Sequence, residues 1–216
     1  GIRNKISLDK KKSEILPLGA DIISNKHKDY SSLNLIYVGT LNNRNISQTL
    51  EGLAFFLKQY SKYNNITYDI IGDGPGNELN QLKKLVAKLD LINIVTIHGR
   101  IPNNELQYFF DKSNIGISYV PLTDYYEFQP VTKTFEYILS GLICIATDTY
   151  ENRILIDEQN GVLCQDNPRS FANALFNIAR NQEMYCFENI RNSLKEYKWE
   201  KIIESKLKPI LNKVYA

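Results

Sequence analysis

The segment EFQPVTKTFEYILSGLICIATD, Glu127–Asp148, carries the strongest local signals in this 216-residue sequence. It predicts a helix over Val131–Ser140 with Pro130 in the first turn, where a missing N–H costs a helix nothing. Gly141 follows, at the place where a helix C-terminus favours a left-handed residue. The apolar run Leu142–Ala146 then predicts a strand buried on both faces, as in a parallel sheet.

Lys133 and Glu136 stand three residues apart, so the predicted helix places them on one side. A lysine beside a helix N-terminus suits phosphate, and a carboxylate accepts hydrogen bonds from sugar hydroxyls. The alternative is an exposed Lys–Glu pair on a surface helix, and the pair alone leaves both interpretations open.

The rest of the chain alternates apolar runs with helical patterns. Further strands are predicted at 33–39, 66–71, 93–98, 114–120 and 161–164. Further helices are predicted at 46–60, 77–89, 103–112, 151–157 and 167–181, the last opened by Asn167-Pro168, and then at 183–197 and 200–215. This alternation predicts a Rossmann-like parallel sheet of about six strands with helices on both faces. Ligands on such folds bind at the carboxyl ends of the strands, so the loops after Val38, Ile71, His98 and Val120 should form the rim of the site.

We divide the chain into a linker or fragment start at 1–14, a Rossmann-like domain at 15–197 and a C-terminal helix at 198–216. The net charge of +2 and the lack of a basic stripe argue against nucleic acid as a partner. Three widely spaced cysteines favour a reducing, cytoplasmic compartment, with Cys144 as a small core residue. Neither metal-binding nor serine-nucleophile motifs occur, so we expect no metal.

The set Pro130, Lys133, Glu136, Tyr137 and Gly141, with Ser140, resembles the donor-binding signature of group 1 glycosyltransferases, which are retaining enzymes of the GT-B architecture. The resemblance implies that Lys133 and the amides near Thr132 hold the donor diphosphate and that Glu136 holds the ribose. A better-known branch of the family has another glutamate eight residues earlier, where this chain has Phe128. Glu127, one residue off that register, is kept as a candidate donor-binding residue.

The loop Gly39–Asn45 follows the first predicted strand, and Gly39 allows the backbone to approach a ligand closely. The family often has an arginine directly after this glycine, where this chain has Thr40, and a lysine a few residues on, near Arg44. The resemblance therefore implies that Arg44 contacts the diphosphate. The alternative is a solvent-exposed arginine in a polar loop.

Two further loops complete the expected rim. GDGPG at Gly72–Gly76 suggests a dinucleotide fingerprint, but its third glycine comes one residue early and no acid follows the next strand, which argues against a nicotinamide enzyme. In the family, a similar turn lies close to the nucleotide, so Gly72 and Gly74 are candidates, with a merely structural tight turn as the alternative. Arg100 and Ile101 are expected near the nucleobase, and His98 is expected to be structural.

The aromatic residues of the loop Pro121–Gln129 could pack on a ligand or cover the sheet edge, and the sequence leaves both possibilities open. The resemblance implies one half of a GT-B enzyme that takes a nucleoside diphosphate sugar as donor, needs no cofactor and modifies a glycan or lipid-linked acceptor in polysaccharide biosynthesis. The N-terminal acceptor domain, with any catalytic residue, is expected to lie outside these 216 residues, which would leave this chain inactive alone. The full-length protein could associate with the inner face of the membrane. A non-catalytic nucleotide-sugar-binding or interaction module is the alternative.

Overall fold

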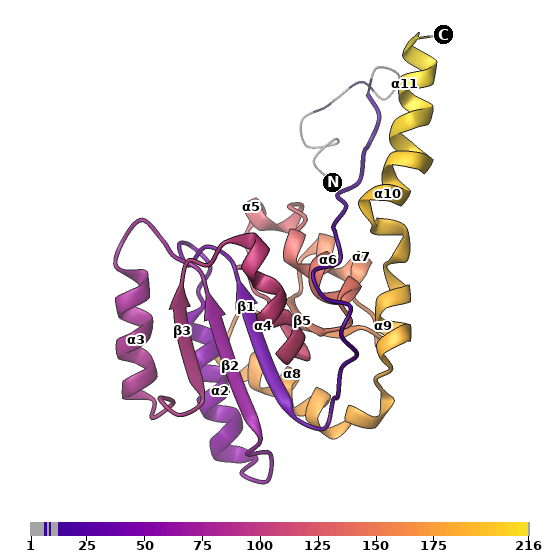
Figure 1. The fold of residues 1–216 in the computed structure, drawn as a ribbon. Coiled ribbons are helices and arrows are strands. Elements are labelled where there is room, and N and C mark those ends of the chain that lie inside the picture. Colours follow the sequence, from indigo (N-terminus) through magenta and orange to yellow (C-terminus); the bar gives the residue numbers. More distant parts are fainter. Residues whose placement is uncertain (1–6, 8, 10–12, 216) are drawn as a thin grey trace.

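The computed structural model of the protein describes residues 7, 9 and 13–215, with side chains to residue 212. The described residues form a six-stranded parallel sheet in the order β3-β2-β1-β4-β5-β6 (Figure 1). The strands are β1 (Leu33–Val38), β2 (Ile66–Ile71), β3 (Val95–Gly99), β4 (Ile115–Ser118), β5 (Ile143–Thr147) and β6 (Gly161–Cys164). This confirms the predicted α/β sheet, and its strand order is that of a dinucleotide-binding Rossmann fold.

The first strand, β1, lies in the middle of the sheet, between β2 and β4. β1 pairs with β2 from Leu33↔Ile66 to Val38↔Ile71, and with β4 at Leu35↔Ile115 and Ile36↔Gly116. The pairing with β4 therefore ends before the carboxyl end of β1. The two strands diverge there, and this divergence opens the crevice in which ligands of such sheets bind.

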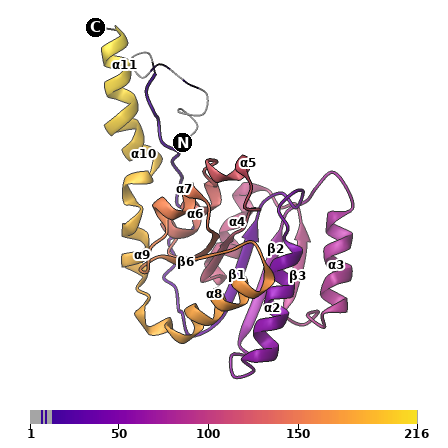
Figure 2. The same cartoon turned by 180° about the vertical axis from the view of Figure 1, so that it is seen from behind.

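Helices cover both faces of the sheet. One face carries α2 (Ser47–Gln59), α3 (Glu78–Lys88) and α8 (Pro168–Arg180); Figure 2 shows α2 and α8 in front of the strands and α3 beside β3 at the edge. The other carries α4 (Leu106–Lys112), which follows the 3₁₀ turn η1 (Asn103–Glu105), and α6 (Thr132–Leu139), against which α9 (Phe187–Ser193) packs (Figure 1). Two short helices, α5 (Asp124–Glu127) and α7 (Tyr150–Leu155), follow β4 and β5.

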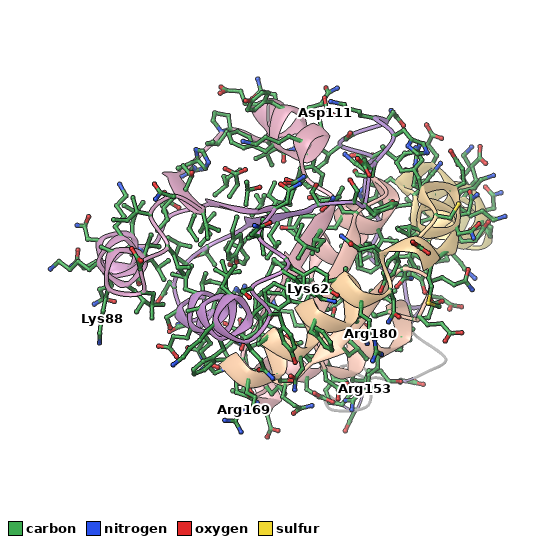
Figure 3. All side chains as sticks on the ribbon, turned by 90° about the horizontal axis from the view of Figure 1, so that it is seen from below. Lys62, Lys88, Asp111, Arg153, Arg169 and Arg180 are labelled. Atoms are coloured by element: carbon green, nitrogen blue, oxygen red, sulfur yellow. The ribbon has the colours of Figure 1, made fainter. Side chains whose placement is uncertain are left out.

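Local sequence explains where α8 begins and how it packs. The side chain of Asn167 accepts a hydrogen bond from the N–H of Ser170, and Pro168 occupies the first turn, as predicted. Phe171, Leu175 and Ile178 recur at helical spacing and are fully buried. Figure 3 shows the charged side chains of Lys88 and Arg169 projecting outward from the helices that cover this core.

The central segment folds largely as predicted. Gly141 has φ +76° and ends α6 in the left-handed conformation that a residue with a Cβ rarely adopts. All five residues of β5 are buried, and Cys144 lies in the core, where burial raises the pKa of its thiol. The start of α6 differs by one residue. Val131 is extended, so Pro130 lies two residues before the helix rather than in its first turn.

Two predictions of local structure were wrong. The expected single helix at 183–197 is α9 alone, flanked by 3₁₀ turns η2 (Gln182–Met184) and η3 (Lys195–Tyr197), because Tyr185 and Cys186 are extended. The buried ring of Phe187 lies where a Cβ on Gly141 would be, so a tertiary contact fixes this register. The segment Asp124–Glu127 was expected to be loop and instead forms α5.

The C-terminal helix leaves the domain beside the segment that enters it. It consists of α10 (Trp199–Ile202), a π-helical turn η4 (Ile203–Leu207) and α11 (Lys208–Tyr215), and Figures 1 and 2 both show it next to the N-terminal segment. The N–H of Ala20 donates to the carbonyl of Tyr197 at 3.0 Å, and the N–H of Trp199 donates to the carbonyl of Ala20 at 3.3 Å. Among the described residues, no helix has both the length and the apolar character that crossing a membrane requires.

Candidate functional site

A cavity of about 210 Å³ lies where β1 and β4 diverge, at their carboxyl ends. Its walls come from the loop after β1 and from the loop between β4 and α6. The lining residues are Tyr37, Val38, Gly39, Thr40, Arg44, Ile117, Ser118, Tyr119, Val120, Tyr126, Gln129, Pro130, Val131, Thr132 and Lys133. The cavity therefore brings together two groups of sequence-predicted site residues that lie about 90 residues apart in the chain. The first group is Gly39, Thr40 and Arg44, and the second is Thr132 and Lys133.

The loops after β1 and β2 hold each other in place. The N–H of Gly39 donates to the carbonyl of Ile71 at 3.0 Å, and the N–H of Leu41 donates to the carbonyl of Asp73 at 2.8 Å. Gly72 has φ +153°, and a Cβ there would overlap the carbonyl oxygen of Gly39. Gly72 thus allows the two loops to pass closely, and it lies outside the lining of the cavity.

Gly74 belongs to a tight turn that opens α3. A Cβ on Gly74 would lie 2.8 Å from Oε2 of Glu78, which also accepts a hydrogen bond from the N–H of Gly76 at 2.9 Å. The observed contacts are those of a tight turn, and contact of Gly74 with a nucleotide stays a prediction.

Arg44 reaches the cavity from its loop and stacks on Tyr126. Its Cζ atom lies 4.6 Å from the centroid of the Tyr126 ring, within the range of a cation–π contact. Its Nη1 atom is buried and has no hydrogen-bond partner among the described residues. Nearby, the Tyr37 hydroxyl donates to the carbonyl of Thr40 at 2.5 Å, and burial raises the pKa of Tyr37, while the charge of Arg44 opposes that rise.

Tyr137 fixes α6 against β1. Its ring is fully buried, fills the space above Gly116 of β4 and stacks on Phe110. Its hydroxyl accepts a hydrogen bond from the N–H of Val38 at 2.8 Å. This hydrogen bond fixes the position of α6 relative to the carboxyl end of β1, on the side of the cavity opposite the loop that carries Arg44.

A buried polar network supports the floor of the cavity. The hydroxyls of Ser118 and Thr134 lie 2.6 Å apart, and Thr134 also donates to Oδ1 of Asn152 at 3.1 Å. Nδ2 of Asn152 donates to the carbonyl of Thr147, whose hydroxyl accepts the N–H of Val120 at 3.1 Å. This network joins β4, α6, β5 and α7, so it locks the helix N-terminus to the strand ends.

Lys133 and Glu136 form the predicted same-side pair. The ammonium of Lys133 donates to Oε2 of Glu136, and the two side chains are only 21% and 13% exposed, so the pair is not the solvent-exposed one of the alternative interpretation. Burial raises the pKa of Glu136, and the charge of Lys133 opposes that rise. Lys133 lines the cavity and Glu136 does not, so the ribose role of Glu136 stays a prediction.

Gln129 lines the cavity and carries a second buried, unpaired atom. Its Oε1 is buried and, within the part of the chain that the structure describes, accepts no hydrogen bond. Neither Gln129 nor Tyr126 has a specific role that could be predicted from the sequence. The only local signal is a polar and aromatic loop directly before a candidate phosphate helix, and that signal does not say which side chains turn inward.

The remaining candidates lie outside the lining. Glu127 accepts a hydrogen bond from Nη2 of Arg153 at 2.5 Å, and Nε of Arg153 lies 3.5 Å from Oδ1 of Asp148. Arg100 is exposed and Ile101 is half-buried, directly after Gly99. Their contacts with a donor, and that of Glu127, stay predictions.

His98 lies on the sheet beside α4 rather than in the cavity. Its Nε2 lies 2.5 Å from Oδ1 of the buried Asp69, whose Oδ2 is 3.0 Å from the ammonium of Lys112. The imidazole also packs edge-on against Phe109. These contacts support the structural role that we expected. No group of three or more His, Cys, Asp and Glu side chains within the described ranges could hold a metal ion.

Comparisons with known proteins agree on one family and one architecture. The sequence profile described as glycosyl transferases group 1 matches residues 32–181. A comparison with curated protein sequences finds no match. Among solved structures, the fold is similar to sucrose-phosphate synthase from Thermosynechococcus elongatus, with a TM-score of 0.74 and 19% identity over 94% of this chain and 52% of that one.

Two other solved structures give the same picture. The lipopolysaccharide outer core galactosyltransferase WaaB has a TM-score of 0.71 and 16% identity over 99% of this chain and 60% of its own. Anabaena HepE in complex with UDP-glucose has a TM-score of 0.69 and 13% identity over 98% of this chain and 51% of its own. The chain therefore spans between 51% and 60% of the length of these three structures.

Proposed function

The chain belongs to the group 1 glycosyl transferases and has the fold of one GT-B domain, and from that premise we propose that it binds the nucleoside diphosphate sugar donor of a retaining enzyme. The observation that carries this proposal is the cavity between β1 and β4. Two cationic side chains, Arg44 and Lys133, enter it from opposite walls, and the N-terminus of α6 opens onto it.

The chemistry of the cavity suits a diphosphate beside a hydroxyl-bearing group. The buried, unpaired Nη1 of Arg44 is a donor that an anionic oxygen would satisfy, and the buried Oε1 of Gln129 is an acceptor that a hydroxyl would satisfy. The backbone N–H groups at the start of α6 add further donors and a partial positive charge. At about 210 Å³, the cavity is smaller than the roughly 300–1,000 Å³ of a complete ligand site, so it would enclose only part of a nucleotide sugar.

In the proposed reaction, the bond between the anomeric carbon and the terminal phosphate oxygen breaks, and its electron pair leaves with the diphosphate. The acceptor hydroxyl forms the new bond on the same face of the sugar and passes its proton to the departing phosphate oxygen. Arg44, Lys133 and the α6 N-terminus would stabilise the charge of the departing diphosphate, which is electrostatic catalysis worth several kcal/mol. Glu136, one turn along α6, would accept hydrogen bonds from the ribose.

The rest of the enzyme is also part of the proposal. Because this chain spans little more than half of each of the three structures, we infer that an acceptor-binding domain and any catalytic residue that it carries lie outside these 216 residues. The acceptor would be a glycan or a lipid-linked sugar in polysaccharide biosynthesis, at the cytoplasmic face of the membrane. UDP-glucose is the ligand named for HepE, and it is a reasonable first donor to test here.

The alternative is a non-catalytic nucleotide-sugar-binding module on the same fold. Thr40 and Phe128 favour it, because each replaces a residue that the family often uses to contact the donor. Sugar transfer by the full-length protein distinguishes the two, since only the enzyme would release a nucleoside diphosphate in step with acceptor modification.

The proposal is tested by calorimetry with UDP, GDP and ADP and with the corresponding monophosphates. Arg44→Ala should weaken binding of the preferred diphosphate by about 10- to 100-fold, since a charged hydrogen bond contributes roughly 1.5–3 kcal/mol. The monophosphate should lose less affinity. Arg180→Ala removes the same charge at the far end of α8 and serves as the matched control (Figure 3). Equal losses for both ligands, or no diphosphate binding by the wild type, would contradict the proposal.

A further inference from the structure

Arg44 lies between two exposed residues of the loop after β1. The loop runs from Gly39 to Ile46 and is anchored by the buried Leu41 and Ile46, whereas Asn43 and Asn45 are exposed and have φ values of +54° and +52°. No acidic side chain among the described residues forms an ion pair with the guanidinium. An arginine in this position would lose considerable rotamer freedom when it binds a ligand, unless another residue has already fixed it.

Tyr126 supplies that constraint from the opposite wall of the cavity. Its ring lies under the guanidinium of Arg44 at 4.6 Å, and its hydroxyl donates to the carbonyl of Asn43 at 3.2 Å. The same side chain therefore contacts both the charged group and the backbone that carries it. Tyr126 belongs to α5, where its N–H donates to the carbonyl of Thr123 at 3.0 Å.

Stacking on Tyr126 leaves the N–H groups of the Arg44 guanidinium available to donate hydrogen bonds. A guanidinium is planar and can stack through its face while its N–H groups donate in the plane to phosphate oxygens. In this cavity, Nη1 is removed from water and has no partner within the described part of the chain. Arg44, which lines the cavity, is therefore held with one desolvated donor that no described protein group satisfies.

We propose that Tyr126 is a positioning residue that preorganises Arg44 for the donor diphosphate. This inference rests on the proposed function, because it assigns Tyr126 a role only if Arg44 binds the diphosphate. Preorganisation reduces the ordering that binding itself must supply, so it should appear in the affinity for diphosphate. Replacing the ring by an aliphatic side chain should weaken that affinity by about 3- to 30-fold, the range expected for one partly desolvated cation–π contact.

The test is a double-mutant cycle between Tyr126→Leu and Arg44→Ala. Binding of UDP, GDP and ADP is measured by ligand-observed NMR into the millimolar range, so that weakened variants stay measurable. Tyr126→Leu should lose about 3- to 30-fold in the wild-type background and nothing further in the Arg44→Ala background. Tyr126→Phe keeps the stack and should retain most of the affinity. Tyr108→Leu is the matched control, because Tyr108 is 67% exposed and lies outside the cavity lining.

Each outcome decides the inference. Wild-type affinity in Tyr126→Leu would overturn it, as would an equal loss in both backgrounds, which would mean that Tyr126 contacts the ligand without Arg44. A merely structural role would lower the melting temperature of Tyr126→Leu and would leave a loss of affinity in both backgrounds. If the wild type binds no diphosphate, the proposed function fails and this inference with it. If Arg44→Ala weakens binding and Tyr126→Leu does not, only this inference fails.

Discussion

Replacing Tyr137 by phenylalanine removes one oxygen atom from the contact between α6 and β1. Along β1, the N–H groups of Leu33 and Gly39 donate to carbonyls of Asn65 and Ile71 on the β2 side, whereas the N–H of Asn34 points toward β4 and donates to Oδ1 of Asn114. By this alternation, the N–H of Val38 also points toward β4. The β1–β4 pairing ends at Ile36↔Gly116, and the Tyr137 hydroxyl takes the place of a strand partner at 2.8 Å.

The size of the effect follows from what phenylalanine keeps and what it loses. The ring would still cover Gly116 and stack on Phe110, at a centroid distance of 5.4 Å, so the packing is preserved. The N–H of Val38, a half-buried residue that lines the cavity, would lose its protein partner. Loss of one partly buried hydrogen bond costs about 0.5–1.5 kcal/mol. For a domain of this size, that corresponds to a fall in melting temperature of roughly 1–6 °C.

Urea unfolding of wild type and Tyr137→Phe, followed by tryptophan fluorescence and circular dichroism, measures this difference directly. The urea midpoint should fall at an unchanged slope, because the surface exposed on unfolding is the same. Tyr125→Phe removes a hydroxyl from an exposed ring and should change stability by less than about 0.5 kcal/mol. If Tyr137→Phe is as stable as Tyr125→Phe, the hydroxyl does not complete the sheet and the reasoning fails.

Three further predictions concern the donor, a buried lysine and transfer. Glu136→Ala should weaken ribonucleotide binding by about 10- to 100-fold and Glu136→Gln by less; if Glu136→Ala still distinguishes a ribonucleotide from its 2′-deoxy analogue as well as the wild type does, the ribose role is wrong. Lys28 is buried and donates to the carbonyl of Phe110 at 2.5 Å, and desolvation lowers its pKa from 10.5 to about 8. Between these two pH values, Lys28 keeps its proton in the unfolded chain and has released it in the folded protein. The free energy of unfolding of the wild type, relative to that of Lys28→Met, should therefore rise from about pH 8 to pH 10.5 in urea titrations. If this difference does not change with pH, desolvation does not lower the pKa of Lys28. Finally, the chain alone should bind nucleotide and transfer no sugar in an assay with radiolabelled donor, so that transfer without added protein would refute the idea of an external acceptor domain.

Local chemistry made much of this fold predictable. The apolar runs at β1, β2 and β5 have the composition of strands buried on both faces, and their alternation with amphipathic helices leaves a parallel sheet as the compact arrangement. Asn167 and Pro168 mark the start of α8, and Gly141 marks the end of α6, because capping depends on residues within one turn. The spacing of Lys133 and Glu136 likewise fixes that they meet, whatever surrounds the helix.

The predictions that were wrong concern segments in which distant contacts override local preference. Residues 183–197 have a helical pattern, yet the chain becomes extended at Tyr185 and Cys186 so that Phe187 can pack on the bare Gly141. The loop after β4 gave no clear helical signal, yet α5 forms there with Tyr126 stacked on Arg44 from the facing loop. In both places, a contact between segments far apart in the chain decides the local conformation.

The α/β class of this protein, most of its helices and strands and the contact between Lys133 and Glu136 follow from the sequence alone. The tertiary structure was needed to see that Tyr126 and Gln129 line the same cavity as Arg44 and Lys133, that Glu127 pairs with Arg153, and that the Tyr137 hydroxyl bonds Val38 where β1 and β4 separate. The reason is physical. Periodicity, capping and close spacing act within a few residues, whereas the direction of a loop side chain depends on segments that meet only after the sheet has formed.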